Sequence, residues 1–273
     1  MALEVLILPY SWFKSRTAFL ELQCLINKAY DKPQHQFKLI ETPRIYTETS
    51  LLKDLYISPN DECCFYLLLG GCNEIHQFEE QNGVRNFKER QVEACFDCDI
   101  TEEFISKFDL SRLDDAKITI ADDSFEMDDR VVRRCLVALA LKTYHGQLFQ
   151  SSETRAKVYE LTAFCSFMRN AAARFLNYVI DHLLLSPDLF QILSTSTKLK
   201  ELDAIIIHAD YIVEHNLEQY YLAKCGFQKS PQEEDTHIKV NSDGAATYLV
   251  AEKTVVANRD FHISYIYRVI EVA

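Results

Sequence analysis

The sequence has no apolar run as long as the roughly 18–20 residues that a membrane-spanning helix requires, although the chain has 273 residues. Its amino terminus, MALEVLILPYSWFKSR, has no basic stretch before the apolar run and no small-residue cleavage site. It therefore lacks the pattern of a signal peptide. We expect a soluble protein of the cytoplasm, with nuclear access left open and no membrane partner.

The cysteines lack the pattern of a zinc site. Nine are present, and several lie singly in apolar segments, as do Cys24, Cys135, Cys165 and Cys225. Free thiols commonly pack in this way in intracellular chains. One Cys-x-x-Cys occurs, CFDC at residues 95–98, but no second ligand pair follows at a matching spacing. We expect reduced thiols and no metal, with zinc or redox chemistry at residues 95–98 as the alternative.

Basic residues are fewer than acidic ones, 29 Lys and Arg against 41 Asp and Glu, which gives a net charge of −12. Binding to a nucleic-acid backbone needs clustered positive charge, so no nucleic acid is expected as a partner. An acidic protein attracts cationic substrates, such as a small amine, a polyamine or a basic peptide. The alternative is that the charge serves solubility alone.

Apolar residues make up 48% of the chain, with 17 Phe and 14 Tyr, which indicates a packed globular protein. Pro33 should end the first helix, and Gly226 should cap the last one. Residues 73–90 are polar and irregular, which predicts a loop, and residues 131–141 fit a buried helix without requiring one. The periodicity predicts helices at 17–30, 49–56, 169–185, 189–193 and 213–225, and strands at 3–8, 63–69, 92–100, 116–121, 158–167, 202–208, 246–250 and 261–270. This order indicates an α/β or α+β protein.

Three segments together resemble the GNAT superfamily of N-acetyltransferases. The string NLEQYYLAKCGF at residues 216–227 is similar to the family's late helix, and residues 202–208 lie where the family has its fifth strand. Residues 157–185 resemble the fourth strand, the pyrophosphate-binding turn and the helix after it. The resemblance implies a mixed, mostly antiparallel central sheet flanked by helices, with the fourth and fifth strands splayed. It is best over residues 157–227, within one domain (1–273) that has a divergent insertion at 73–150.

A strand that runs through a sharp turn into a helix directs free backbone N–H groups at one point, where they can hold a pyrophosphate. The family's turn reads Gln/Arg-x-x-Gly-x-Gly/Ala, whereas residues 168–174 here read MRNAAAR. Aligning on the helix places Ala171 and Ala173 at the glycine positions, and the other register places Ala172 and Arg174 there. Alanine keeps the N–H donors, but its methyl group prevents the closest approach of a phosphate. The resemblance implies that acetyl-CoA contacts Phe164, Cys165, Met168, Arg169, Asn170, Ala171, Ala172, Ala173, Arg174 and Asn216.

Acetyl transfer to an amine needs a deprotonated amine and a proton for the departing thiolate. The family's acid is a Tyr on the late helix, which makes Tyr220 and Tyr221 the candidates here; we select Tyr221, although it precedes Phe227 by six residues rather than the usual five. The base is either Glu160 on the fourth strand or His208 at the end of the fifth. The structural alternatives are that both tyrosines pack against the sheet and that Glu160 faces solvent.

We therefore predict an N-acetyltransferase that moves an acetyl group directly from acetyl-CoA to an amine, either as a monomer or as a homodimer. One alternative is a catalytically silent GNAT-like domain that serves as a binding or scaffold protein, because the turn lacks glycines. Another is a structural α/β domain in which the late-helix match is a coincidence.

Overall fold

The computed structural model describes residues 3–90, 96–146, 155–230, 233–241, 244–248 and 253–272. Its strands are β1 (Glu4–Pro9), β2 (Cys63–Leu69), β3 (Lys117–Ile120), β4 (Cys135–Thr143), β5 (Ala156–Ser166), β6 (Ala204–Ile212), β7 (Gln228–Lys229), β8 (Thr236–Ile238), β9 (Ala245–Tyr248), β10 (Lys253–Val256) and β11 (Phe261–Glu271). Its α-helices are α1 (Tyr10–Lys14), α2 (Leu20–Phe37), α3 (Leu51–Asp54), α4 (Cys72–Asn82), α5 (Glu102–Ile105), α6 (Asp129–Arg133), α7 (Ala171–Tyr178), α8 (Pro187–Leu193) and α9 (Glu218–Cys225). Shorter turns are η1 (Leu110–Asp115), η2 (Val179–Leu184), η3 (Leu199–Glu201) and η4 (Val213–His215).

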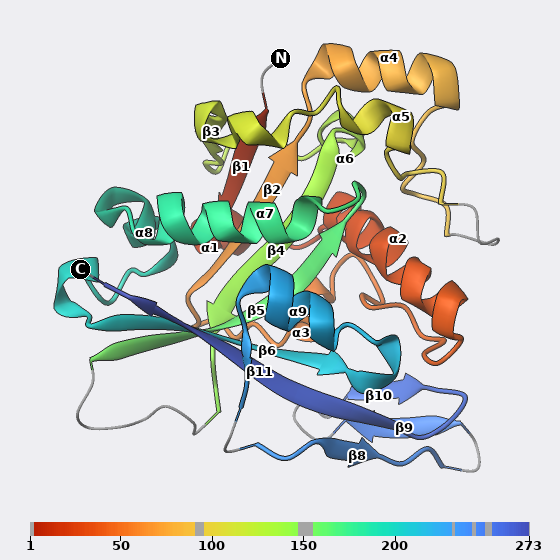
Figure 1. Ribbon diagram of the computed structural model, residues 1–273, viewed down its shortest axis with the longest axis vertical. Coiled ribbons are helices and arrows are strands. Elements are labelled where there is room, and N and C mark those ends of the chain that lie inside the picture. Colours follow the sequence, from red (N-terminus) through yellow and green to blue (C-terminus); the bar gives the residue numbers. More distant parts are fainter. Residues whose placement is uncertain are drawn as a thin grey trace.

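One nine-stranded sheet forms the centre of the molecule (Figure 1). Its strand order is β3-β1-β2-β4-β5-β6-β11-β7, and β8 pairs with β11 beside β7. The strands pair antiparallel except for β1 with β3 and β5 with β6, which are parallel. Strands β9 and β10 form a separate hairpin. The sheet is thus mixed and mostly antiparallel, and helices flank it, as the resemblance implied.

The sheet separates two hydrophobic cores, because alternate side chains of a strand point to opposite faces. In β1, Val5 and Ile7 pack with the helices α4, α7 and α8, whereas Leu6 and Leu8 pack with α1 and α2. Strand β2 is buried along its whole length because both of its faces are covered. A strand buried on both faces has a continuous apolar sequence rather than an alternating one, which explains the CCFYLLL run.

Most of the predicted elements are present. The strands expected at 3–8, 63–69, 116–121, 158–167 and 261–270 correspond to β1, β2, β3, β5 and β11. The helix expected at 169–185 is formed by α7 and the π-helical turn η2, and the helix expected at 189–193 is α8, which begins with Pro187. Strand β6 continues four residues past the predicted end at residue 208. Within residues 73–150, β3 and β4 belong to the central sheet.

Two predictions about helices were wrong. Helix α2 does not stop before Pro33 but continues to Phe37 and ends where Lys38 adopts a positive φ of 48°. Pro33 removes one N–H donor, yet the turns around it are held from outside, since Arg90 Nη2 donates to Asp31 Oδ1 and Gln34 Oε1 at 2.6 Å each. Residues 72–82 form helix α4 rather than a loop. Its buried residues, Ile75 and Phe78, make a stripe too short for the periodicity to reveal.

Three further segments differ from the predictions. Residues 131–141 are not one helix: α6 ends at Arg133, and the buried strand β4 follows, without alternation because both of its faces are covered. Of the strand expected at 92–100, residues 92–95 lie outside the described residues, and 96–100 form a turn. Arg85 Nε donates to Cys98 O in that turn at 2.8 Å. The helix expected at 213–225 is interrupted at Asn216, whose φ is 54°, so α9 begins only at Glu218.

Candidate functional site

The parallel strands β5 and β6 separate part of the way along the sheet. They pair from Ala156 with Ala204 to Glu160 with His208, and no pair is formed beyond that point among the described residues. Strand β5 continues to Ser166 beside β4, and the register shifts between Ala138 and Ala140 of β4. Opposite this shift, β5 carries one extra residue next to Ala163, whose φ is 49°. Residues with a Cβ rarely adopt this left-handed conformation, so the shift is a bulge that bends β5. The edge of β5 beyond Glu160 thus faces an opening in the hydrogen-bond ladder.

The turn after β5 leads into α7, on the same side of the sheet as α9 (Figure 1). Asn170 begins the helix with a φ of 61°, which asparagine tolerates better than most residues. Ala171 is fully buried, and Ala172 and Ala173 are each 8% exposed. The N–H of Ala171 donates to Met168 O at 3.3 Å, and the N–H of Ala173 donates to Tyr220 Oη at 2.9 Å. A donor expected to hold pyrophosphate is therefore already used by a side chain of α9.

The other residues predicted to contact acetyl-CoA are distributed around this turn and beyond it. Met168 is buried, whereas Arg169 is exposed and pairs with the exposed Glu102 at 2.7 Å. Arg174 points to solvent, and Cys165 is half-buried. Asn216 is exposed and, among the described residues, its side chain makes one hydrogen bond, to Glu214 O at 3.4 Å. Among the described residues, no hydrogen bond joins this side chain to residues 168–174.

Tyr221 lies half-buried among aromatic rings on the side of the sheet that carries α9. Its ring centroid is 6.2 Å from that of Phe164, 5.6 Å from that of Tyr211 and 6.0 Å from that of Phe227. Burial raises the pKa of Tyr221, and the nearby Tyr30 and Asp210 add to the rise. The hydroxyl therefore keeps its proton at neutral pH, and the same burial disfavours the tyrosinate that proton donation would leave. The hydroxyl of Tyr220, in contrast, accepts the hydrogen bond from the N–H of Ala173 in the turn.

Glu160, one of the two predicted bases, does not face open solvent. Its side chain is 25% exposed and forms an ion pair at 2.9 Å with Lys142, which is 2% exposed. Burial raises the pKa of Glu160; Lys142 opposes this rise, and Asp210 adds to it. The carboxylate thus already serves as the counterion of a buried lysine.

His208, the other predicted base, is adjacent to Glu160 across the last β5–β6 pair. It is 5% exposed, its Nε2 lies 3.0 Å from Glu233 Oε2, and its ring contacts that of Tyr144 at 4.5 Å. Its Nδ1 has no hydrogen-bond partner among the described residues. The structure thus places both predicted bases at the point where the strands separate.

Four groups that the sequence did not indicate meet near this point. Asp210 lies on β6 two residues past the last pair, and its charge contributes to raising the pKa of Tyr221. Burial lowers the pKa of Arg44, but Tyr30 and Asp210 outweigh this effect and raise it. Burial also raises the pKa of Tyr56 to about 12. The alternation of Asp210 with His208 along β6 was a usable signal, whereas Tyr30, Arg44 and Tyr56 come from distant segments.

Neither a metal centre nor a membrane helix is found in the part of the chain that the structure describes. No three His, Cys, Asp or Glu side chains there are grouped to hold a metal ion, and the described cysteines are free thiols. Of the sequence CFDC, Cys95 lies outside the described residues, and Cys98 is buried. No described helix is long and apolar enough to cross a membrane.

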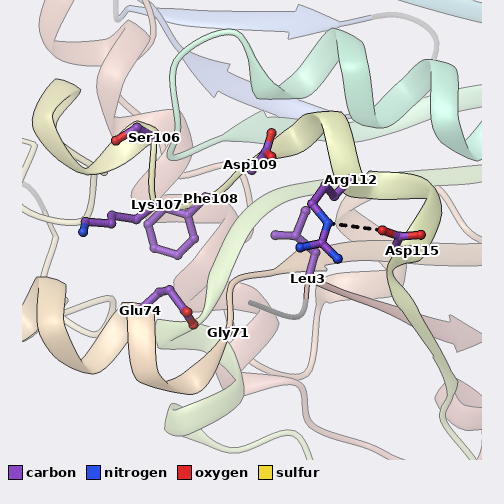
Figure 2. A pocket seen from close by; sticks show the side chains of 9 residues that line it. All are labelled: Leu3, Gly71, Glu74, Ser106, Lys107, Phe108, Asp109, Arg112 and Asp115. Carbon is purple, nitrogen blue, oxygen red and sulfur yellow. Dashed lines mark hydrogen bonds and ion pairs between the residues drawn. The ribbon is translucent and has the colours of Figure 1, made fainter.

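A surface pocket of about 280 Å³ lies elsewhere (Figure 2). The residues that line it come from the position before β1, the link between β2 and α4, α4 itself, and the segment from the end of α5 through η1. They are Leu3, Gly71, Glu74, Ser106, Lys107, Phe108, Asp109, Arg112 and Asp115. None of them belongs to β5, β6, α7 or α9, so this pocket is separate from the site described above.

Comparison with known proteins assigns the family. The protein-family model of sporulation protein RMD6 matches residues 1–270. The chain belongs to the sporulation protein RMD6 family. Sporulation protein RMD6 of Saccharomyces cerevisiae (strain ATCC 204508 / S288c) is 23% identical to this chain over 268 residues, which cover 95% of this chain and 92% of the yeast protein. The family description specifies no chemical reaction.

One solved structure provides a weaker comparison. It is a spermidine N-acetyltransferase, the SpeG K23-Y30 chimera from Vibrio cholerae and hSSAT. The match covers 74% of this chain and 94% of that one, with 11% identity and a TM-score of 0.23. A score this low does not establish a shared fold, so the architecture described above rests on the sheet itself.

Proposed function

We propose that this protein is an N-acetyltransferase that moves an acetyl group directly from acetyl-CoA to an amine. The observation that carries the proposal is the opening between β5 and β6. Unpaired strand edges offer N–H and C=O groups that need partners. The edge of β5 beyond Glu160 could therefore hold an extended, amide-containing chain such as pantetheine.

The residues at the opening supply the groups that the reaction needs. Acetyl-CoA provides the activated thioester. Tyr221 is the candidate to give a proton to the departing thiolate, since its hydroxyl stays protonated at neutral pH. Glu160 and His208 are the candidates to take the proton of the amine. The net charge of −12 supports a cationic acceptor, such as a small amine, a polyamine or a basic peptide.

The fit of acetyl-CoA to these residues differs between its two ends. The edge of β5 suits the pantetheine arm, because the backbone groups of β5 beyond Glu160 do not pair with β6. The turn suits the pyrophosphate less well, because the N–H of Ala173 already donates to Tyr220 and the alanines are buried. This second observation favours the alternative function, a catalytically silent domain that binds other molecules or serves as a scaffold.

Thermal unfolding and calorimetry with acetyl-CoA separate the two functions. A ligand at 100 times its Kd stabilises the folded state by about 2.7 kcal/mol, which is measurable in either assay. The enzyme should bind acetyl-CoA and, with a panel of amines, release free thiol. CoA lacking the acetyl group serves as the control for cofactor binding without turnover. If millimolar acetyl-CoA does not stabilise the folded protein, the proposal of an N-acetyltransferase is wrong, and the proposal of a catalytically silent domain is supported.

A further inference from the structure

His208 is held by contacts on several sides. On β6 it lies between Glu160 of β5 and Tyr267 of β11. Its ring centroid is 4.5 Å from that of Tyr144 and 6.0 Å from that of Tyr265. These contacts fix the ring plane, so the two ring nitrogens occupy defined positions.

The two nitrogens have different environments. Nε2 lies 3.0 Å from the Oε2 atom of Glu233, which follows β7 and whose side chain is 18% exposed. Nδ1 is buried and lacks a partner among the described residues. Buried polar atoms are nearly always hydrogen-bonded, and an exception calls for an explanation such as an ordered water or a catalytic role.

The partner of Nε2 determines the tautomer. A neutral imidazole carries one N–H and one lone pair, and an ionised carboxylate can only accept a hydrogen bond. Glu233 therefore selects the form in which Nε2 carries the hydrogen. The lone pair then lies on Nδ1, the nitrogen without a protein partner. A carboxylate that orients a histidine in this way is a common device for preparing a base.

We infer that Glu233 is a positioning residue that holds His208 as the Nε2–H tautomer, so that Nδ1 is the proton acceptor of this site. The inference rests on the proposed function. It also selects His208 over Glu160, because Glu160 is occupied as the counterion of the buried Lys142. Asp210 lies on the same face of β6, two residues further along the strand.

The proton balance of the proposed step is complete without a further reactant. The amine nitrogen bonds to the acetyl carbon, and Nδ1 of His208 takes a proton from that nitrogen. The C–S bond breaks, and the thiolate takes the proton of Tyr221. The proton on His208 then returns through solvent to the Tyr221 oxygen. One N–H bond has been exchanged for one S–H bond, and both side chains end in their starting states.

Nitrogen-15 NMR of the histidine rings tests the tautomer without any need for activity. The His208 signals are assigned by their loss in His208→Asn, since the chain has eight histidines. We expect the Nε2–H form in the unmodified protein, a mixture of tautomers in Glu233→Ala, and a largely retained Nε2–H form in Glu233→Gln, whose amide oxygen can still accept. Glu234→Ala, which changes the adjacent exposed carboxylate, should leave the signals unchanged.

Kinetics test the role of the tautomer. We expect Glu233→Ala to lower kcat by roughly 10-fold to 100-fold with an unchanged KM for acetyl-CoA, because the loss concerns proton transfer. Glu233→Gln should recover part of the rate. An Nδ1–H tautomer in the unmodified protein, or a kcat in Glu233→Ala equal to that of Glu234→Ala, overturns the inference. If acetyl-CoA is neither bound nor consumed, the proposed function fails, and the NMR result still decides whether Glu233 sets the tautomer.

Discussion

The hydrogen bond between the turn and α9 leads to a prediction about cofactor affinity. Tyr220 Oη accepts from the N–H of Ala173 at 2.9 Å and so competes with any phosphate oxygen for that donor. Tyr220→Phe removes the hydroxyl and keeps the ring that packs beside Tyr221. The substitution should therefore release the donor and leave the helix in place.

Two opposite effects follow, a loss of stability and a larger gain in cofactor affinity. An ordinary hydrogen bond contributes about 1 kcal/mol to stability, so Tyr220→Phe should unfold at a temperature lower by roughly 2–4 °C. A hydrogen bond from the released N–H to a charged phosphate contributes about 1.5–3 kcal/mol. Acetyl-CoA should therefore bind at least about 10-fold more tightly to the variant than to the unmodified protein, since 1.4 kcal/mol corresponds to a factor of ten.

Isothermal titration calorimetry measures the affinity, and thermal unfolding measures the stability. Tyr211→Phe is the control, because it removes a hydroxyl that bonds to Glu218 of the same helix at 3.0 Å. It should cost similar stability without any gain in affinity. Equal or weaker binding of acetyl-CoA to Tyr220→Phe would refute the competition and would indicate that the hydroxyl itself assists the cofactor.

Two further predictions concern the acid and the stability of the sheet. Tyr221→Phe should lower kcat at least about 10-fold with little change in acetyl-CoA affinity, as measured by steady-state kinetics and calorimetry; an unchanged kcat would remove Tyr221 from the reaction. Glu62 accepts hydrogen bonds from Ser194, Ser196 and Tyr159 and forms an ion pair with Lys157. Burial raises the pKa of Glu62, but the hydrogen bonds from Lys157 and Ser196 outweigh burial and lower this pKa from 4.5. A lowered carboxyl pKa gives stability that is present above pH 4.5 and is lost as the pH falls below it. Glu62→Gln should therefore lower the free energy of unfolding, measured in urea, by about 1–2 kcal/mol at pH 7 and by much less at pH 3. An equal loss at both pH values would contradict this stabilising role of the ionised Glu62.

Sequence patterns predicted those helices and strands that depend only on their own residues. The run at 63–69 and the apolar face of α7 and η2 needed no distant partner to be recognised. Helix α2 could not be predicted to its end, because Arg90, from a remote segment, holds the turns around Pro33. Strand β4 could not be distinguished from a helix, because its burial on both faces removes the alternation on which the distinction depends.

The positions of some candidate site residues in the fold could be predicted, whereas their roles stay predictions. Glu160 and His208 were selected from their strands, and the structure pairs them directly. Which of two adjacent tyrosines faces α7 depends on the rotation of α9, since neighbours on a helix point about 100° apart. The sequence therefore could not show that Tyr220, rather than Tyr221, bonds to Ala173. Glu233 was missed for a different reason: it lies in a short connection after a two-residue strand, where no periodicity exists.

The division of the interior by the sheet has a consequence for how mutations combine. Leu176 of α7 and Leu25 of α2 belong to different cores with the sheet between them, so the free energies of substitutions at these positions should add. Where β5 and β6 separate, the division is incomplete, and Tyr221 on one side is electrostatically linked to Tyr30 on the other. Energetic coupling between the two layers should therefore be concentrated at this one place, where the two substrates of the proposed reaction would meet.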